Sequence, residues 1–229
     1  MRICIPIRES NLKKAQKQVG KALVKLKERK DSLVEIWFDD FDSLQDLLRL
    51  DCFAEARKDI AVIAVCRAAA EKGSFKGSEQ ERINVLKMAI EAGSQLVDVS
   101  MDTELPLIKG LKTVCDNHGA KLIISKHFWD SMPDLGILEA IYDKAESMGA
   151  DIVKIAVFID KWEQNADLFE LCKRLNNRQT KFIVIGMGKK GKISRIGCPL
   201  LGSYLTYVAL DAKSKTADGQ MTFAEISQL

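Results

Sequence analysis

Histidine and long apolar runs are scarce in this chain of 229 residues, and each shortage excludes a class of function. Only two histidines are present, His118 and His127, so the chain has no histidine-rich metal site. No apolar run approaches the roughly 18 residues that a membrane-spanning helix needs. The glycine-rich sequences that bind nucleotide phosphates are also missing after every predicted strand. We therefore expect no metal and no membrane partner.

The chain also lacks a large excess of charge of either sign. The 35 lysines and arginines nearly balance the 32 acidic residues, which leaves a net charge of +3. The lysines are scattered along the predicted helices and form no basic block, so the composition does not predict a nucleic-acid partner. A mild positive charge is compatible with a small anionic substrate.

None of the six cysteines forms a CxxC pair, and several lie in apolar patterns. We interpret them as reduced core thiols, and neither as disulfides nor as metal ligands. Residues 1–8 resemble a strand and are too short for a secretory signal. We expect a cytoplasmic protein.

Eight apolar runs that alternate with helical patterns are the dominant signal. Continuous apolar strands in this order indicate a parallel sheet with helices outside it, and eight units in about 250 residues fit a (β/α)8 barrel. We predict a TIM barrel with one domain over residues 1–229; a doubly wound open sheet is the alternative. The predicted strands are residues 2–7, 33–38, 60–66, 95–99, 121–125, 151–157, 181–186 and 204–210. The predicted helices are residues 10–30, a helix from 43, 78–92, 104–118, 133–147, 161–176 and 222–229, with a short helical turn within the loop 191–201.

Three helix starts have local signals. Ser10 is expected to cap the first helix, and Ser78 forms a capping box with Glu81. Pro133 is expected to open the helix that ends near Ser147.

Lys154 stands in the middle of the apolar run at residues 151–158. A lysine is rarely buried without a partner, and burial favours the neutral amine that imine chemistry requires. The alternative is a side chain at the strand end that reaches water. This stretch alone leaves both interpretations open.

Other polar residues are predicted near the carboxyl ends of strands, where barrel enzymes place their chemistry. Glu35 either binds substrate hydroxyls or belongs to a structural ion pair. Arg67 either holds an anion or forms a salt bridge with Glu71 or Asp98. His127 follows the fifth predicted strand and suits a general base, although a lone histidine is often structural.

Two loops complete the candidates. Residues 187–195, rich in glycine and lysine, either cradle an anion or form a solvated turn. Residues 214–220 are polar and suit a lid.

Taken together, these segments resemble the type I 3-dehydroquinate dehydratase family, which works in the shikimate pathway of aromatic amino acid biosynthesis. The resemblance runs from the first strand to Gln220. It rests on the ordered segments 123–127, 150–156, 187–195, 201–203 and 217–220.

The resemblance implies a role for each candidate. Lys154 forms an imine with the ketone of 3-dehydroquinate, His127 removes the C2 proton, and Glu71 partners the histidine. Arg195 binds the substrate carboxylate. The resemblance implies no cofactor and a homodimer. It also implies that four residues contact hydroxyls or close the lid: Glu35, Arg67, Thr216 and Gln220.

The chain departs from the family pattern on the second strand, where Trp37 replaces the usual arginine. Lys72 replaces a glycine after Glu71, and Asp218 replaces a proline. Thr216 stands where serine is usual. Further departures are Lys126, Phe128 and Ser100. Two alternatives to the dehydratase therefore stay open: a Schiff-base lyase or aldolase on a related polyol keto acid, and a homologue that binds quinate-like ligands without turnover.

Overall fold

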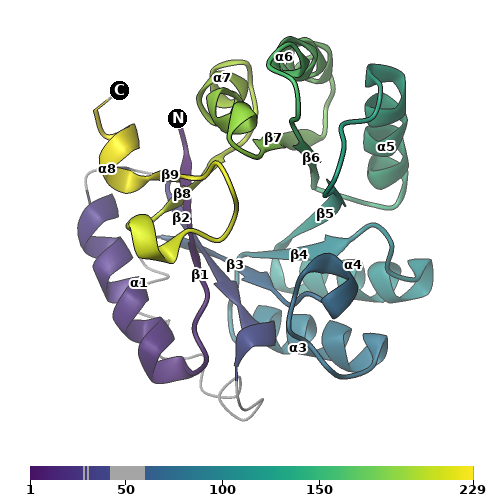
Figure 1. The fold of residues 1–229 in the computed structure, drawn as a ribbon. Coiled ribbons are helices and arrows are strands. Elements are labelled where there is room, and N and C mark those ends of the chain that lie inside the picture. The colour runs from purple at the N-terminus through teal and green to yellow at the C-terminus, as the bar shows by residue number, and fades with distance from the viewer. Residues whose placement is uncertain (28, 30, 42–59, 229) are drawn as a thin grey trace. The chain divides into compact units, whose positions relative to one another are not determined.

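The computed structural model describes residues 1–27, 29, 31–41 and 60–228 (Figure 1). Cys52 and the helix predicted from Ser43 lie outside these residues. The chain divides into two compact units, which are described separately. Residues 5–123 form the N-terminal unit, and residues 1–4 with 124–229 form the C-terminal unit. The prediction of a single domain stays a prediction.

Strands and helices alternate along the chain, as the apolar runs predict. The strands are β1 (Ile3–Ile7), β2 (Leu33–Trp37), β3 (Ala61–Val65), β4 (Leu96–Ser100), β5 (Lys121–Phe128), β6 (Ile152–Phe158), β7 (Lys181–Met187), β8 (Thr206–Ala209) and β9 (Met221–Thr222). The helices are α1 (Leu12–Leu26), α3 (Glu79–Glu91), α4 (Leu105–His118), α5 (Leu135–Ser147), α6 (Gln164–Leu175), α7 (Ser194–Leu200) and α8 (Phe223–Ile226). Short 3-10 helices are η1 (Phe38–Asp40), η3 (Ala69–Glu71), η4 (Lys190–Ile193) and η5 (Ala212–Ser214).

In the N-terminal unit, β2, β3 and β4 form a parallel ladder. Leu33 pairs with Ala61, and Val65 pairs with both Trp37 and Asp98. The strands are almost wholly buried, which explains why their sequences are mainly apolar on both faces, with Glu35 and Asp98 as the charged exceptions. The ladder therefore brings the polar residues at the strand ends to one edge.

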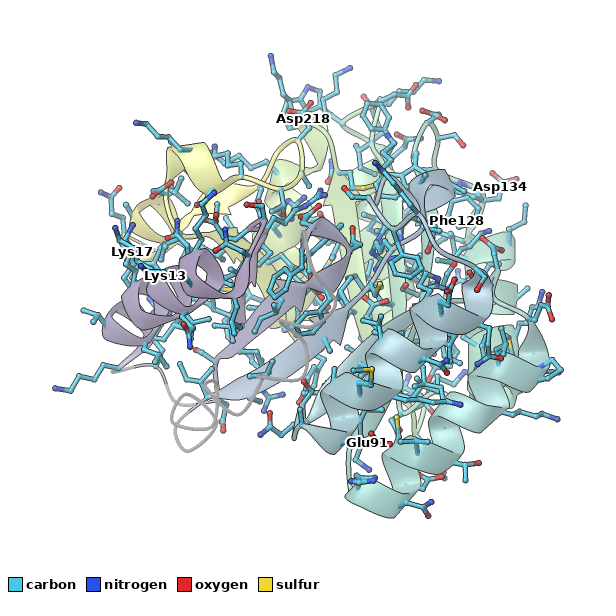
Figure 2. The ribbon with its side chains drawn as sticks, turned by 90° about the horizontal axis from the view of Figure 1, so that it is seen from below. Lys13, Lys17, Glu91, Phe128, Asp134 and Asp218 are labelled. Atoms are coloured by element: carbon cyan, nitrogen blue, oxygen red, sulfur yellow. The ribbon has the colours of Figure 1, made fainter. Side chains whose placement is uncertain are left out.

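The helices of this unit are amphipathic. Ala15, Val19, Ala22 and Leu26 are buried along α1, while Lys13 and Lys17 are exposed. Figure 2 shows both lysines on the outer face of α1. The lysines of this helix are thus part of a solvated face.

In the C-terminal unit, β6 and β7 pair in parallel over their full length, from Ile152 with Lys181 to Phe158 with Met187. The first part of β1 pairs with β8, which in turn pairs with β9. Figure 1 shows α5, α6 and α7 as successive coiled segments of this unit. The parallel ladders fix the positions from which β6 and β8 project their side chains.

Two of the predicted helix starts are corrected. Asn11, and not Ser10, caps α1, because its side chain accepts a hydrogen bond of 3.1 Å from the Lys14 amide. Helix α5 begins at Leu135 after Asp134, so Pro133 precedes the helix. The capping box of Ser78 and Glu81 is confirmed.

Four elements are longer than predicted or additional. Strand β5 continues to Phe128, three residues past the predicted end at Ser125. Residues predicted as a loop with one turn form η4 and α7, and the two-residue strand β9 was not predicted. The five described cysteines are buried, as expected for core thiols.

Candidate active site

The predicted site residues divide between the two units. Lys154, His127, Arg195, Thr216 and Gln220 belong to the C-terminal unit. The N-terminal unit contains Glu35, Arg67 and Glu71. We describe the contacts within each unit in turn.

Lys154 is buried in the interior of the C-terminal unit. It is the third of seven residues in β6, and only 4% of its surface is exposed. Its Nζ lies 3.0 Å from the hydroxyl oxygen of Tyr207 and 4.5 Å from the centre of the Tyr207 ring. The interpretation of Lys154 as a side chain that reaches water at the strand end is therefore wrong.

Tyr207 was not predicted as a site residue. It lies in β8, opposite Cys4 of β1, and is 6% exposed. In an apolar strand a tyrosine resembles any other core aromatic residue. The available signal was chemical, because a buried phenol needs a polar partner.

His127 lies inside β5 and not after it. Its ring is stacked on the indole of Trp129, with centroids 4.8 Å apart and an interplanar angle of 10°. Both side chains are half-buried. The stacking restricts the plane of the imidazole, so Trp129 is a second neighbour of the site that the sequence analysis missed.

Arg195 is the second residue of α7 and is 3% exposed. Its Nη2 donates to the carbonyl oxygen of Asp218 at 3.5 Å, and within the described residues its Nε has no hydrogen-bond partner. Burial lowers the pKa of this guanidinium to about 10. An anion bound at Nε would offset the burial of the charge.

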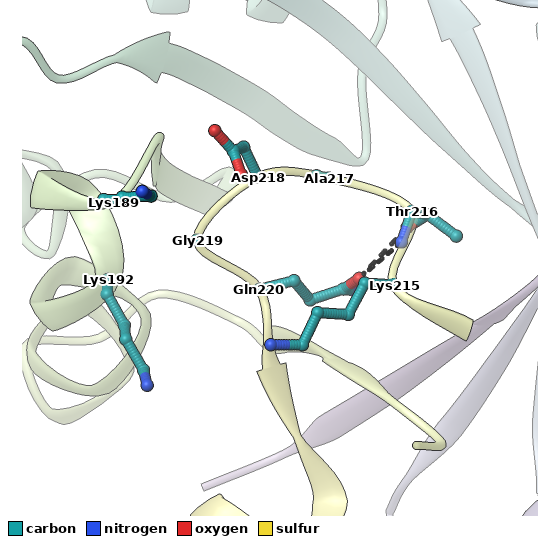
Figure 3. A pocket seen from close by; sticks show the side chains of 8 residues that line it. All are labelled: Lys189, Lys192, Lys215, Thr216, Ala217, Asp218, Gly219 and Gln220. Carbon is teal, nitrogen blue, oxygen red and sulfur yellow. Dashed lines mark hydrogen bonds between the residues drawn. The ribbon is translucent and has the colours of Figure 1, made fainter. Parts of the chain in front are cut away.

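Residues 214–220 were predicted as a lid; Ser214 ends η5, and the loop 215–220 that follows rests against the turn after β7. Gln220 is 1% exposed and accepts hydrogen bonds from the Thr216 amide at 2.8 Å and hydroxyl at 3.3 Å (Figure 3). The Gly188 amide donates to the carbonyl of Asp218 at 3.2 Å. Gly219 has φ +74°, and a Cβ there would lie 2.1 Å from the Gly188 oxygen, so the contact requires glycine.

This loop borders an open hollow of about 510 Å³. Figure 3 shows three lysines around it, namely Lys189, Lys192 and Lys215. Lys192 forms an ion pair of 2.6 Å with Glu225. The hollow is therefore rimmed by cations on the same unit as Arg195.

In the N-terminal unit, Glu35 is 2% exposed and shares its face of β2 with Trp37. The indole Nε1 of Trp37 donates to Oε1 of Glu35 at 2.8 Å. The residue that stands where the family has arginine thus binds the candidate carboxylate.

Arg67 forms the ion pairs that the sequence analysis considered for it. Its Nη2 lies 2.9 Å from Oδ2 of Asp98, and its Nη1 lies 3.5 Å from Oε1 of Glu71. Arg67 and Asp98 are almost fully buried. The pair fixes the guanidinium beside Glu71, and this position is compatible with a further role in binding an anion or hydroxyl.

Asp39 holds both ends of the loop that carries Glu71. Its Oδ1 accepts from the Arg67 amide at 3.0 Å, and its Oδ2 accepts from the Ser74 amide at 2.9 Å. Burial raises the pKa of the Asp39 carboxyl and outweighs these two hydrogen bonds, which lower it. Asp39 therefore ties both ends of the loop to the segment that follows β2, and the Ser74 hydroxyl adds a hydrogen bond of 2.9 Å to Asp40.

Arg8 supplies a cation next to Trp37. Its guanidinium lies 4.2 Å from the centre of the Trp37 ring and binds Asp40 through two hydrogen bonds, of 2.7 and 2.8 Å. Burial alone raises the pKa of the Asp40 carboxyl, but hydrogen bonds from Arg8 and Ser74 bring it below its ordinary value.

The described residues contain neither a candidate metal site nor a candidate membrane-spanning helix. No group of three histidine, cysteine or acidic side chains there could hold a metal ion. None of the helices in the same residues is both long and apolar enough to cross a membrane.

Parallel strands that alternate with helices define an α/β protein, and a lysine buried in one of these strands suits an enzyme of the (β/α)8 class. The comparisons with solved structures agree. A 3-dehydroquinate dehydratase from Geobacillus kaustophilus is 23% identical and has a TM-score of 0.89, with 99% of this chain and 88% of that chain covered. A type I 3-dehydroquinate dehydratase from Clostridium difficile, solved with covalently modified comenic acid, is 25% identical and has a TM-score of 0.85, with 99% and 89% covered. The predicted fold class is confirmed.

The profile of the family described as Type I 3-dehydroquinase matches residues 3–229, and the chain belongs to this family. A 3-dehydroquinate dehydratase from Methanocaldococcus jannaschii is 32% identical over 99% of this chain and 96% of its own length. One from Dehalococcoides mccartyi is 34% identical over 80% of this chain and 82% of its own length. The predicted family and its enzyme class, the hydro-lyases, are confirmed.

The loop after η3 gives a test of the family departure at Lys72. Lys72 has φ +59°, a left-handed conformation that glycine adopts without strain, and it is exposed. We expect Lys72→Gly to raise the free energy of unfolding by about 1 kcal/mol. A Cβ on the neighbouring Gly73 would lie 2.1 Å from the Arg67 carbonyl oxygen. Gly73→Ala should therefore lower it by about 1–3 kcal/mol. Urea unfolding of both variants measures these changes. A Lys72→Gly variant less stable than the wild type would contradict the left-handed conformation assigned to residue 72.

The ion pair of Arg8 and Asp40 gives a test by pH. The folded-state pKa of Asp40 is below its ordinary value, so the contribution of the pair is present above that value and is lost as the pH falls through the lowered pKa. Because the pair is partly exposed, we expect Asp40→Asn to lower stability near pH 7 by only about 0.5–1 kcal/mol, and less at acidic pH.

Asp116→Asn is the control for this measurement, because it removes an exposed pair with Lys112 on a single helix. Its effect should be smaller near neutral pH. An effect of Asp40→Asn that stays the same from neutral to acidic pH would contradict the lowered pKa.

Proposed function

We propose that this chain dehydrates 3-dehydroquinate to 3-dehydroshikimate through an imine on Lys154, a step of the shikimate pathway and hence of aromatic amino acid biosynthesis. The observation that carries the proposal is the burial of Lys154 in the middle of β6, with Nζ held by Tyr207. Membership of the type I 3-dehydroquinase family supports the substrate and the reaction.

The chemistry begins at the amine. Nζ of Lys154 attacks the C3 ketone, and the oxygen leaves as water to give an iminium ion. The iminium accepts electrons from the adjacent carbon, which makes the C2 proton more acidic. A base removes this proton, and the C1 hydroxyl leaves as water. Hydrolysis of the imine then releases the product and restores the amine.

His127 is the proposed base. Its ring plane is restricted by Trp129, which suits a group that must meet one particular proton. Glu71 is the proposed carboxylate partner of this histidine. A positioned base contributes roughly 10²–10⁴-fold to a rate, so His127→Ala should lose turnover and still form the imine.

Arg195 is proposed to bind the substrate carboxylate. Burial of Arg195 lowers its pKa to about 10, and a bound carboxylate would stabilise the charged guanidinium and raise that pKa. Thr216 and Gln220 are proposed to close the site as parts of the loop 215–220. The hydrogen bonds from Thr216 to Gln220 support this proposal, because they hold the two residues of the loop together.

Glu35 and Arg67 are proposed to contact the hydroxyls of the substrate. Here the chain differs from the family, because the indole of Trp37 donates to Glu35 and offers one N–H where an arginine has five. This observation favours a second candidate function, a Schiff-base lyase or aldolase on a related polyol keto acid. Turnover of a panel of such acids by the wild type and by Trp37→Arg separates the two.

We also propose a homodimer in the cytoplasm. Light scattering of the purified chain measures the oligomeric state.

The main test uses borohydride to reduce the imine. Wild-type protein with 3-dehydroquinate and borohydride should gain the mass of one reduced adduct, and peptide mapping should place it on Lys154. Lys154→Ala should gain no adduct and lose turnover, because no other amine replaces the nucleophile. The absorbance of the conjugated enone product follows turnover in the same samples.

The matched control is Lys181→Ala, which removes a lysine from the exposed start of β7. It should form the adduct at the wild-type rate. An adduct on another residue, or turnover that survives in Lys154→Ala, would refute the proposal. Stabilisation by quinate with neither adduct nor turnover would indicate a ligand-binding homologue.

A further inference from the structure

We propose that Tyr207 is the positioning residue of Lys154, whose hydroxyl orients the amine for attack on the ketone; this inference rests on the function proposed above. The hydroxyl oxygen lies 3.0 Å from Nζ, and the two side chains are 6% and 4% exposed. The family resemblance gave no role to this residue.

The backbone holds the two side chains in register. Lys154 stands opposite Ile183 in the parallel ladder of β6 and β7. Tyr207 stands opposite Cys4, and the next residue, Val208, stands opposite Met221. Tyr207 is therefore fixed by strands on both sides of β8.

The side chains differ in flexibility. A lysine has four rotatable bonds and many rotamers, whereas a tyrosine has two torsions and a rigid ring. A hydrogen bond from Nζ to the phenol thus ties the mobile end of Lys154 to a rigid point. Tyr207 also places its ring 4.5 Å from Nζ, so the ring and the hydroxyl act on the same atom.

This arrangement sets the direction of the lone pair. One N–H of the amine points to the phenol oxygen, so the lone pair of the neutral amine points elsewhere, toward an incoming carbonyl carbon. When nitrogen forms the C–N bond, the carbonyl electron pair moves to oxygen. One nitrogen proton passes to that oxygen, which takes a second proton from solvent and leaves as water, and the other N–H stays on the iminium nitrogen. Tyr207 keeps its own proton throughout, because a hydroxyl can accept from N–H without being consumed.

Tyr207→Phe tests the inference, because it keeps the ring and removes the hydroxyl. We expect kcat and the rate of borohydride-trapped adduct formation on Lys154 to fall together by about ten-fold, the factor of one ordinary hydrogen bond. KM should change little. The dissociation constant of quinate, which has no ketone at C3, should stay at the wild-type value.

Tyr142→Phe is the matched control. Tyr142 is a buried tyrosine of the same unit, and its hydroxyl donates to the Thr180 carbonyl at 2.6 Å. Its loss should lower the melting temperature and leave the adduct rate per folded molecule unchanged. Quinate binding to Tyr207→Phe shows that this variant is folded, so a lower adduct rate is not a loss of folded protein.

The outcomes separate this inference from the proposed function. If the wild type forms the adduct and Tyr207→Phe forms it equally fast, Tyr207 has no positioning role. If adduct formation and quinate binding fall together in Tyr207→Phe, its role is structural and the inference is overturned. A wild type that forms no adduct overturns the proposed function and this inference with it.

Discussion

The hydrogen bond between Nζ of Lys154 and the hydroxyl of Tyr207 is the contact on which the account of this molecule depends. An amine placed among buried β-branched side chains is costly unless a polar group meets it. The chain supplies that group from β8, a strand whose other residues are buried as well. The parallel ladders of the C-terminal unit therefore hold Nζ of Lys154 in the protein interior, away from bulk water.

A second constraint shapes the N-terminal unit, where buried charges are paired within a small region. Arg67 is paired with Asp98 and Glu71. Asp39 accepts hydrogen bonds from the backbone amides of Arg67 and Ser74, at the two ends of the loop that carries Glu71. Breaking a buried pair leaves an uncompensated charge, so the loss of any one partner is strongly destabilising. The replacement of the family arginine by Trp37 fits this network, because the indole donates to one oxygen of Glu35 and stacks on Arg8. The departure therefore places a single N–H donor beside Glu35, where an arginine has five.

Sequence reasoning predicted the alternating fold because buried parallel strands leave continuous apolar runs such as residues 151–158. It placed the strand ends less well where polar residues continue a strand, as in β5, which runs through Lys126 and His127. It missed the cap at Asn11, because Ser10 and Asn11 are equally good caps and the choice depends on the incoming backbone. Tyr207 was missed as a site residue because its importance comes from Lys154, a partner distant in sequence that no local pattern contains. The roles of Lys154, His127 and Arg195 came from the ordered resemblance, since the residues alone left both interpretations of Lys154 open.

A crystal structure of the chain after borohydride reduction with 3-dehydroquinate is the most direct test of the central claim. The account predicts continuous electron density from Nζ of Lys154 to the former C3 carbonyl carbon, with the hydroxyl of Tyr207 still within hydrogen-bond distance of that nitrogen. Density that joins the substrate to a different residue, or a Lys154 side chain turned away from Tyr207 toward solvent, would contradict it.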